Sequence, residues 1–217
     1  MSKTSDHENH LHNSFVCDTE NLSWFPTVGL KLTGACLSHC PFCCEPNRKQ
    51  PFVGLSEFEF IADYLLAAGT KRLCLTGGEP LLYPHLPDFV KYTHSLGIIN
   101  ILLTAESTLL VKKAKDILPY VQGVRLSVHG LDGANDAVFG RPGLFQQVQK
   151  AIQIIKEYDI PAYISTVVTN TNIGSLPEIA DWCLQRGISR YYLYGLVKSG
   201  LGENYITEHG CPSPNEF

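Results

Sequence analysis

The chain has 217 residues, of which 44% are hydrophobic and 18% are charged, so it has the composition of a folded globular protein of one domain or two small ones. Its formal net charge of −4 gives no general reason to bind nucleic acid or an anionic membrane. No apolar run is long enough to cross a bilayer, and the N-terminus lacks the apolar core of a signal peptide, so we expect a cytoplasmic protein.

Residues 1–23 are polar and are expected to form a mobile N-terminal tail, followed by one domain over residues 24–217. From residue 26 onward, strand-like and helix-like patterns alternate along the chain. Strands are predicted at residues 27–34, 72–76, 98–104, 123–129, 162–168 and 190–196. Helices are predicted at residues 56–68, 85–96, 108–118 and 144–158, and from Ser175 to the residue before Gly187. Ser56 and Glu59 have the spacing of a capping box at the start of the first helix.

Five strand–helix units followed by a sixth strand indicate an α/β fold whose parallel strands are joined by helical crossovers. The predicted strands are apolar on both faces, as a sheet covered on both sides requires. A closed barrel of eight units needs a longer chain. We therefore expect a partial (β/α)6 TIM-like barrel.

The sequence after the sixth strand carries a late helix signal. Residues 213–216 (SPNE) combine an N-cap serine, a proline at the first helical position and a capping-box glutamate. The sixth helix is therefore expected to be missing or cut short, with the C-terminal end of the domain truncated. The outer face of the sixth strand, including Tyr191 and Leu193, would then lack a cover, which predicts self-association.

A cysteine cluster directly follows the first predicted strand. Cys36, Cys40 and Cys43 have the spacing C-x-x-x-C-x-x-C, and Cys44 adjoins them. Soft thiolates at this spacing can hold a metal centre from a single loop. Three cysteines leave one iron of a four-iron cluster without a protein ligand, and such an iron can bind a small molecule. A structural zinc site, completed by His39 or Cys44, is the alternative.

This loop resembles the signature of the radical S-adenosylmethionine (radical SAM) superfamily. The sequence TGGEP at residues 76–80 follows the second predicted strand, where that family has its GGEP element. Softer matches extend the resemblance over about residues 26–202, and the pattern is closest to the subgroup of molybdenum-cofactor GTP cyclases and SPASM-type peptide- and protein-modifying enzymes. The subgroup often reads TNG after the third strand, where this chain has Thr104, Ala105 and Glu106. Cys211 alone stands where relatives carry a cysteine-rich domain, so no auxiliary cluster is expected.

The resemblance implies two cofactors, a [4Fe–4S] cluster and S-adenosylmethionine (SAM). Cys36, Cys40 and Cys43 would hold the cluster, whose open iron would bind the amino and carboxylate groups of SAM. Reductive cleavage of SAM would give a 5′-deoxyadenosyl radical that removes hydrogen from a substrate.

The GGEP element and three other residues would bind SAM. Gly77 and Gly78 would let the backbone approach the ligand, Glu79 would pair with its ammonium group, and Pro80 would rigidify the turn. The hydroxyls of Thr104 and Ser127 would contact its ribose or carboxylate, and Phe42 would pack near its adenine. These residues complete the expected SAM site.

The resemblance favours a radical SAM enzyme acting on a peptide or protein, with flavodoxin or ferredoxin as the electron donor. A metal-binding or electron-transfer module, with iron–sulfur or zinc but without SAM chemistry, is the alternative. Cys74 and Cys183 fall in apolar patterns and are expected in the core. His129 and Asp132 either touch the substrate or belong to a satisfied polar loop. No catalytic residue is assigned.

Overall fold

The computed structural model describes residues 25–45 and 54–213. Its strands are β1 (Thr27–Lys31), β2 (Arg72–Thr76), β3 (Ile99–Thr104), β4 (Gly123–Ser127), β5 (Ala162–Val167) and β6 (Tyr191–Tyr194). Its α-helices are α1 (Leu55–Ala67), α2 (Leu86–Ser95), α3 (Ser107–Ile117), α4 (Asp132–Phe139), α5 (Leu144–Glu157), α6 (Leu176–Gln185) and α7 (Leu201–His209). Short 3₁₀ helices are η1 (Pro80–Leu82), η2 (Leu118–Tyr120) and η3 (Ile173–Ser175).

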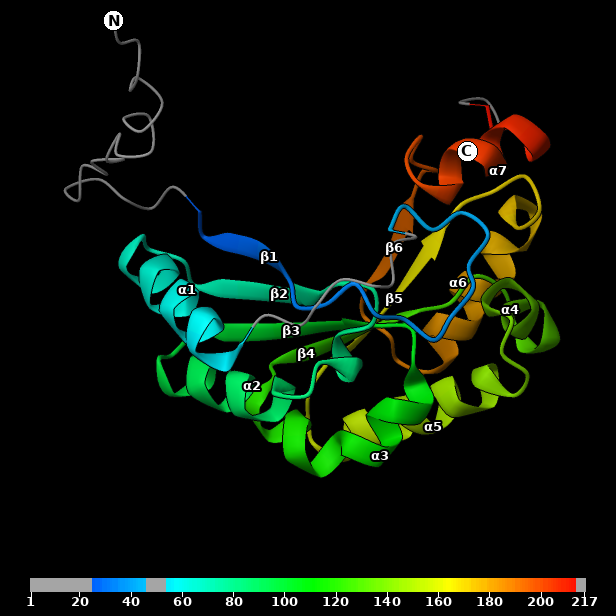
Figure 1. Cartoon of the computed structure of the whole chain (residues 1–217). Helices are drawn as coiled ribbons and strands as arrows, with labels where there is room; N and C mark the ends of the chain where they lie inside the picture. Colours follow the sequence, from blue (N-terminus) through cyan, green and yellow to red (C-terminus); the bar gives the residue numbers. More distant parts are fainter. Residues whose placement is uncertain (1–24, 46–53, 214–217) are drawn as a thin grey trace, which may run out of the picture.

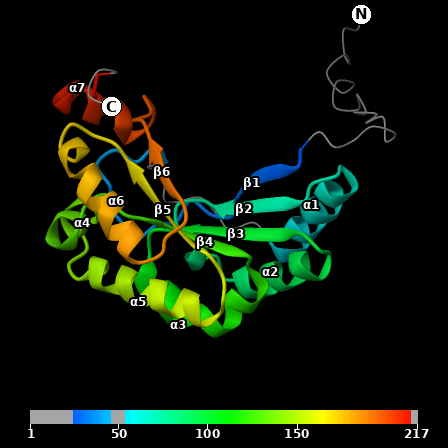
Figure 2. The ribbon, with the colours of Figure 1, turned by 180° about the vertical axis from the view of Figure 1, so that it is seen from behind.

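The six strands form one parallel sheet in the order β1-β2-β3-β4-β5-β6, so each strand pairs with its neighbours along the chain. The sheet curls into a half-barrel, with the helices along its convex side and an open concave side (Figure 1). The reverse view shows the same arrangement (Figure 2). The predicted partial barrel is confirmed, and the ends of the predicted elements agree within a few residues.

The two faces of the sheet differ in burial. On the convex face, Leu75 of β2, Leu126 of β4 and Ile164 of β5 have no exposed surface, because the helices cover them. Neighbouring strand residues on the concave face, such as Arg72 and Arg125, remain exposed or half-buried. The expectation of two covered apolar faces is therefore wrong for the concave face, since a half-barrel leaves that side open.

The two cysteines assigned to the core have different outcomes. Cys183 of α6 is buried with 3% exposure, as predicted. Cys74 of β2 is only half-buried and lines a cavity on the concave face, so its assignment to the core is wrong. Its position in an apolar strand pattern did not distinguish the covered face from the open one.

Three helices, α1, α4 and α7, differ from the sequence prediction. Gly54 is the N-cap of α1 and makes no side-chain cap bond, while the Ser56 hydroxyl donates to Glu57, so the expected capping box is absent from this helix. The short helix α4 was not predicted. Neither was α7, which begins after Gly200. Both helices lie in glycine-containing stretches, which favour a loop interpretation.

A helix does follow β6, although residues 214–217 of the expected late helix lie outside the described residues. Figure 1 places α7 beyond the C-terminal end of β6 and not along its outer face. Leu193 of β6 consequently keeps 46% exposure. Tyr191 is better covered, because it packs against the core and its hydroxyl donates to Thr166 Oγ1 at 3.0 Å. Within the described residues, no helix has the length and apolarity needed to cross a membrane.

Candidate active site

The cysteine loop runs from β1 across the C-terminal edge of the sheet. Cys36, Cys40 and Cys43 are half-buried, and their thiols are not in disulfides. In the described part of the chain, no three metal-binding side chains surround a position for a single ion. Thiolates that hold a multi-iron cluster bind different irons and do not need to meet at one point. Three soft, accessible donors on one loop fit an iron–sulfur cluster.

The GGEP turn after β2 packs against the beginning of the cysteine loop. The backbone N–H of Gly78 donates to the carbonyl of Thr33 at 2.7 Å, and that of Glu79 donates to the carbonyl of Ala35 at 2.7 Å. A side chain at Gly77 would collide with the Thr33 carbonyl, and one at Gly78 with the Ala35 carbonyl. Because these two glycines have no side chain, the GGEP turn can approach the cysteine loop closely enough for the two backbones to form hydrogen bonds.

The Glu79 carboxylate is fully buried and connects this turn to the turn after β3. Its Oε1 accepts hydrogen bonds from Thr104 Oγ1 at 2.7 Å and from the Leu81 N–H at 3.0 Å. Its Oε2 accepts from the backbone N–H groups of Ala105 and Glu106 at 3.0 and 3.1 Å. Burial raises the pKa of Glu79 to about 7. Four donors thus already occupy the two oxygens that were expected to meet the ammonium group of SAM.

A pocket of about 190 Å³ lies at the C-terminal ends of β2, β3, β4 and β5. It is lined by Thr76, Gly77, Gly78, Leu103, Thr104, Ala105, Arg125, Ser127 and Ser165. The pocket therefore brings together four of the expected SAM-binding residues, Gly77, Gly78, Thr104 and Ser127. Glu79 and Pro80 are buried outside its lining.

Phe42 does not line this pocket. Its ring packs edge-on against His129, at a centroid distance of 5.1 Å, and against Tyr205 of α7, at 5.7 Å. Next to it, the backbone N–H of Leu201 donates to the carbonyl of Cys43 at 2.9 Å. The far end of the cysteine loop is therefore held by the segment that follows β6.

Glu106, a residue with no predicted role, links three parts of the site. Its Oε1 accepts hydrogen bonds from Ser38 Oγ in the cysteine loop and from Arg141 Nη1 before α5, both at 2.8 Å. The Glu106 side chain has no exposed surface, and its Oε2 has no hydrogen-bond partner among the described residues. Its one sequence signal was the departure from TNG at residues 104–106.

His129 is buried, and its ring has a hydrogen-bond partner. Its Nδ1 accepts a hydrogen bond from the Val167 N–H at 3.1 Å, and its ring stacks on Phe139 at 5.0 Å. Burial lowers the pKa of His129 to about 4. The structure therefore favours the polar-loop interpretation of this histidine. Asp132 is exposed at the first position of α4 and has a φ of 48°.

Comparison with known proteins agrees with this arrangement. The radical SAM superfamily profile matches residues 30–183. Relatives include the AdoMet-dependent heme synthase of Methanosarcina barkeri (strain Fusaro / DSM 804), with 27% identity over 81% of this chain and 52% of the relative. The PqqA peptide cyclase of Streptomyces rochei is 26% identical over 82% of this chain and 51% of the relative. The chain thus spans about half the length of the curated relatives it matches.

Solved structures share the fold. Streptococcus suis SuiB bound to S-adenosylmethionine superimposes with a TM-score of 0.66 and 20% identity, over 86% of this chain and 48% of that chain. The native anSMEcpe structure with bound AdoMet and a Cp18Cys peptide has a TM-score of 0.66 and 18% identity, over 79% of this chain and 51% of that chain. The profile match over most of the domain shows that the chain belongs to the radical SAM superfamily.

Proposed function

We propose that this chain is the catalytic domain of a radical SAM enzyme. The observation that carries the proposal is the cysteine loop, which presents three thiols that form no disulfide and packs directly against the GGEP turn at the strand-end pocket. When bound, a [4Fe–4S] cluster and SAM supply the chemistry, namely reductive cleavage of SAM to a 5′-deoxyadenosyl radical that removes hydrogen from a substrate.

The protein residues would hold and orient these groups. Cys36, Cys40 and Cys43 would provide the thiolates for the cluster. The backbone at Gly77 and Gly78 and the hydroxyl of Ser127 line the pocket in which SAM would lie. Parallel α/β folds place their sites at the C-terminal ends of the strands, which is where this pocket is found.

Glu79 and Pro80 would shape the cofactor site from behind, and Thr104 would connect Glu79 to the lining of the pocket. Pro80 is buried at the first position of η1, and Glu79 and Thr104 hydrogen-bond each other. A role for the Glu79 carboxylate toward the ammonium group would require it to exchange one of its four present donors. Phe42 would act on SAM only through the end of the cysteine loop, since it packs against His129 and Tyr205.

A peptide or protein substrate is the finer proposal. It is supported by the resemblance to the PqqA peptide cyclase and by the shared fold of SuiB, which was solved with the precursor peptide SuiA. Flavodoxin or ferredoxin would supply the electron. The seven cysteines of the described residues form no disulfide with one another, which supports a reducing compartment such as the cytoplasm.

Anaerobic reconstitution with iron and sulfide tests the proposal. The wild-type chain should bind about four irons with matching sulfide, and the reduced protein should convert SAM to 5′-deoxyadenosine. Joint replacement of Cys36, Cys40 and Cys43 by alanine should abolish both, whereas Cys183→Ala in the core should retain both. Full iron loading of the triple variant would contradict the assignment. Zinc binding without sulfide would favour the structural-metal alternative.

A further inference from the structure

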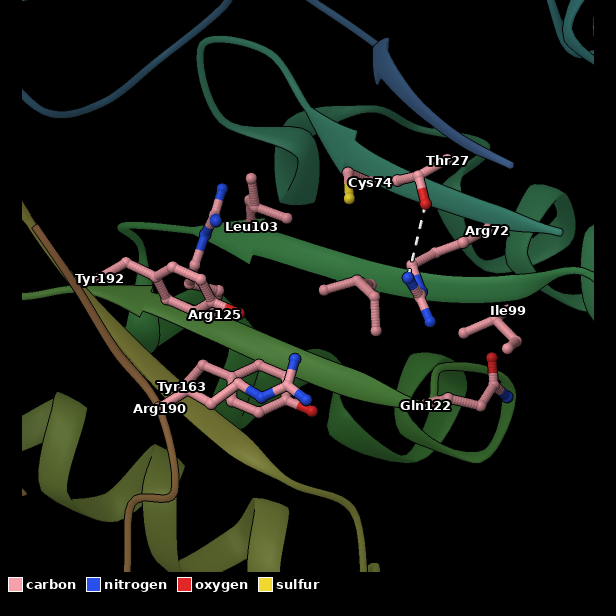
Figure 3. Close-up of a pocket in the computed structure, with 11 residues that line it drawn as sticks. Thr27, Arg72, Cys74, Ile99, Leu103, Gln122, Arg125, Tyr163, Arg190 and Tyr192 are labelled. Carbon is pink, nitrogen blue, oxygen red and sulfur yellow. Dashed lines mark hydrogen bonds between the residues drawn. The ribbon is translucent and has the colours of Figure 1, made fainter. Parts of the chain in front are cut away.

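The concave face of the half-barrel contains a second, larger cavity of about 370 Å³ (Figure 3). Residues of or next to all six strands line it. They are Thr27, Arg72, Cys74, Ile99, Ile101, Leu103, Gln122, Arg125, Tyr163, Arg190 and Tyr192. The lining includes three arginines and no acidic side chain. The cavity therefore has a concentrated positive charge although the whole chain is acidic.

The three guanidinium groups have neutral partners. Arg125 Nη1 donates to the Tyr194 hydroxyl at 2.6 Å, and Arg72 Nη1 lies 3.4 Å from Thr27 Oγ1. None of Arg72, Arg125 and Arg190 forms an ion pair within residues 25–45 and 54–213. Their positive charges are therefore available to an anion from outside this part of the chain.

Tyrosine rings hold two of the guanidinium groups over the concave face. Arg125 lies over the ring of Tyr192, 5.1 Å from its centroid, and Arg190 lies over the ring of Tyr163 at 5.5 Å. Figure 3 shows these two arginines near the tyrosines and Arg72 at the opposite end, beside Ile99 and Gln122. Stacking restricts the arginine side chains before any ligand arrives and lowers the entropic cost of binding.

This cavity adjoins the strand-end pocket. Arg125 and Leu103 line both spaces, so one arginine contacts the proposed SAM site and the larger cavity. A ligand group held by Arg125 would therefore lie next to the cofactor. That position is required of a substrate that loses hydrogen to a radical formed from SAM.

We infer that this cavity is the substrate site and that it binds an anionic group of the substrate, a carboxylate or a phosphate. Guanidinium groups match both through paired N–H donors. The role in catalysis rests on the proposed function, but the binding of an anion does not require SAM cleavage. An acidic side chain of a peptide would satisfy the site.

Calorimetric titration of the reconstituted protein, with SAM present, tests the inference. The probes are propane-1,2,3-tricarboxylate for carboxylates and pyrophosphate for phosphates, each at low and high salt. Arg125→Gln should weaken binding of the preferred probe by about tenfold or more, as loss of a charged hydrogen bond predicts. Arg72→Gln and Arg190→Gln should act in the same direction, and salt should weaken binding. The preferred probe identifies the anion.

Lys91→Gln is the matched control, because it removes one exposed positive charge from α2 on the convex side. It should leave binding within about twofold of wild type. Absence of binding at millimolar probe, or equal binding by the arginine variants and the control, would overturn the inference. Iron content and SAM cleavage are measured on the same samples. Normal SAM cleavage without anion binding overturns this inference alone, and anion binding without SAM cleavage overturns the proposed function alone.

Discussion

Two buried carboxylates in neighbouring turns are stabilised in different ways. Glu79 accepts four hydrogen bonds from three backbone N–H groups and one hydroxyl. Glu106 pairs with Arg141 at 2.8 Å and accepts from Ser38 on the same oxygen. A buried carboxylate is costly unless donors or a cation compensate it. Both buried carboxylates therefore hold the loops around the strand-end pocket together through these hydrogen bonds.

Glu79→Gln separates a structural role from a ligand role. The amide NH₂ of glutamine would face backbone or hydroxyl donors at one of the two oxygen positions. We expect the free energy of unfolding to fall by about 1–3 kcal/mol in urea denaturation, because buried donors would lose their acceptor. Glu157→Gln, at an exposed position in α5, should have almost no effect. Unchanged stability with weakened SAM binding would show that Glu79 is a ligand, as its motif suggests.

His129 makes stability depend on pH in a defined direction. Because burial lowers its pKa from 6.5 to about 4, the unfolded chain binds a proton below pH 6.5 that the folded chain does not bind until about pH 4. The contribution of His129 is complete above pH 6.5 and is lost as the pH falls toward 4, with a total of roughly 3 kcal/mol.

The measurement is the difference in unfolding free energy between wild type and His129→Gln, taken across this pH range. Glutamine retains an acceptor for the Val167 N–H but does not titrate. The wild type should lose stability relative to the variant on acidification. Glu79, whose pKa is raised to about 7, is present in both proteins and therefore cancels. A constant difference would contradict the assignment of a buried neutral histidine.

At the level of elements, the contact between the GGEP turn and the cysteine loop should be intolerant of added volume. A methyl group at Gly78 would collide with the carbonyls of Gly34 and Ala35, which are backbone atoms. We expect Gly78→Ala to lower the unfolding free energy by about 1–3 kcal/mol and to reduce iron loading, since the loop that carries the thiols must move.

Gly133→Ala is the control for this change. Gly133 lies in α4, and nothing lies within 4 Å of an added Cβ there. Alanine at this helical position should preserve or raise stability, by up to about 1 kcal/mol, and should leave iron loading unchanged. Equal iron loading of the two variants would contradict the prediction that the GGEP turn supports the loop that binds iron.

The sequence predicted the strands and helices that have a regular local spacing of apolar residues. Five strand–helix units followed by a sixth strand, with local patterns such as those of β2 and α5, together with the chain length predicted the parallel half-barrel. The helices α4 and α7 could not be predicted in this way, because they lie in glycine-containing stretches and depend on contacts with residues outside each helix. The Asn135 side chain of α4 accepts from the His129 N–H, and Tyr205 of α7 packs on Phe42.

The cysteines and glycines of the site were predictable because their spacing is local. The network of Glu106 was not, since Ser38 is 68 residues away and Arg141 is 35 residues away. The exposed concave face was also missed. Whether a strand in such a sheet has one covered face or two depends on how far the whole sheet closes, and no single strand contains that information.

For the whole molecule, β6 is an edge strand whose outer face is incompletely covered. Leu193 of β6 is 46% exposed and Leu184 of α6 is 72% exposed. An exposed edge with apolar side chains favours association. We expect the chain to self-associate, and Leu193→Lys should shift it toward the monomer in sedimentation velocity. Asn204→Lys, at an exposed position in α7, is the control. A wild-type chain that is wholly monomeric at high concentration would contradict this expectation.

The cysteine loop contacts both ends of the half-barrel. Its first residues bond to the turn after β2, and the Cys43 carbonyl accepts from the Leu201 N–H at the start of α7. A ligand that binds only the folded loop stabilises every contact that depends on it. In hydrogen–deuterium exchange, the Leu201 amide should therefore exchange more slowly in iron-loaded protein than in iron-free protein. The supply of iron would then determine how firmly the segment after β6 is held against the cysteine loop.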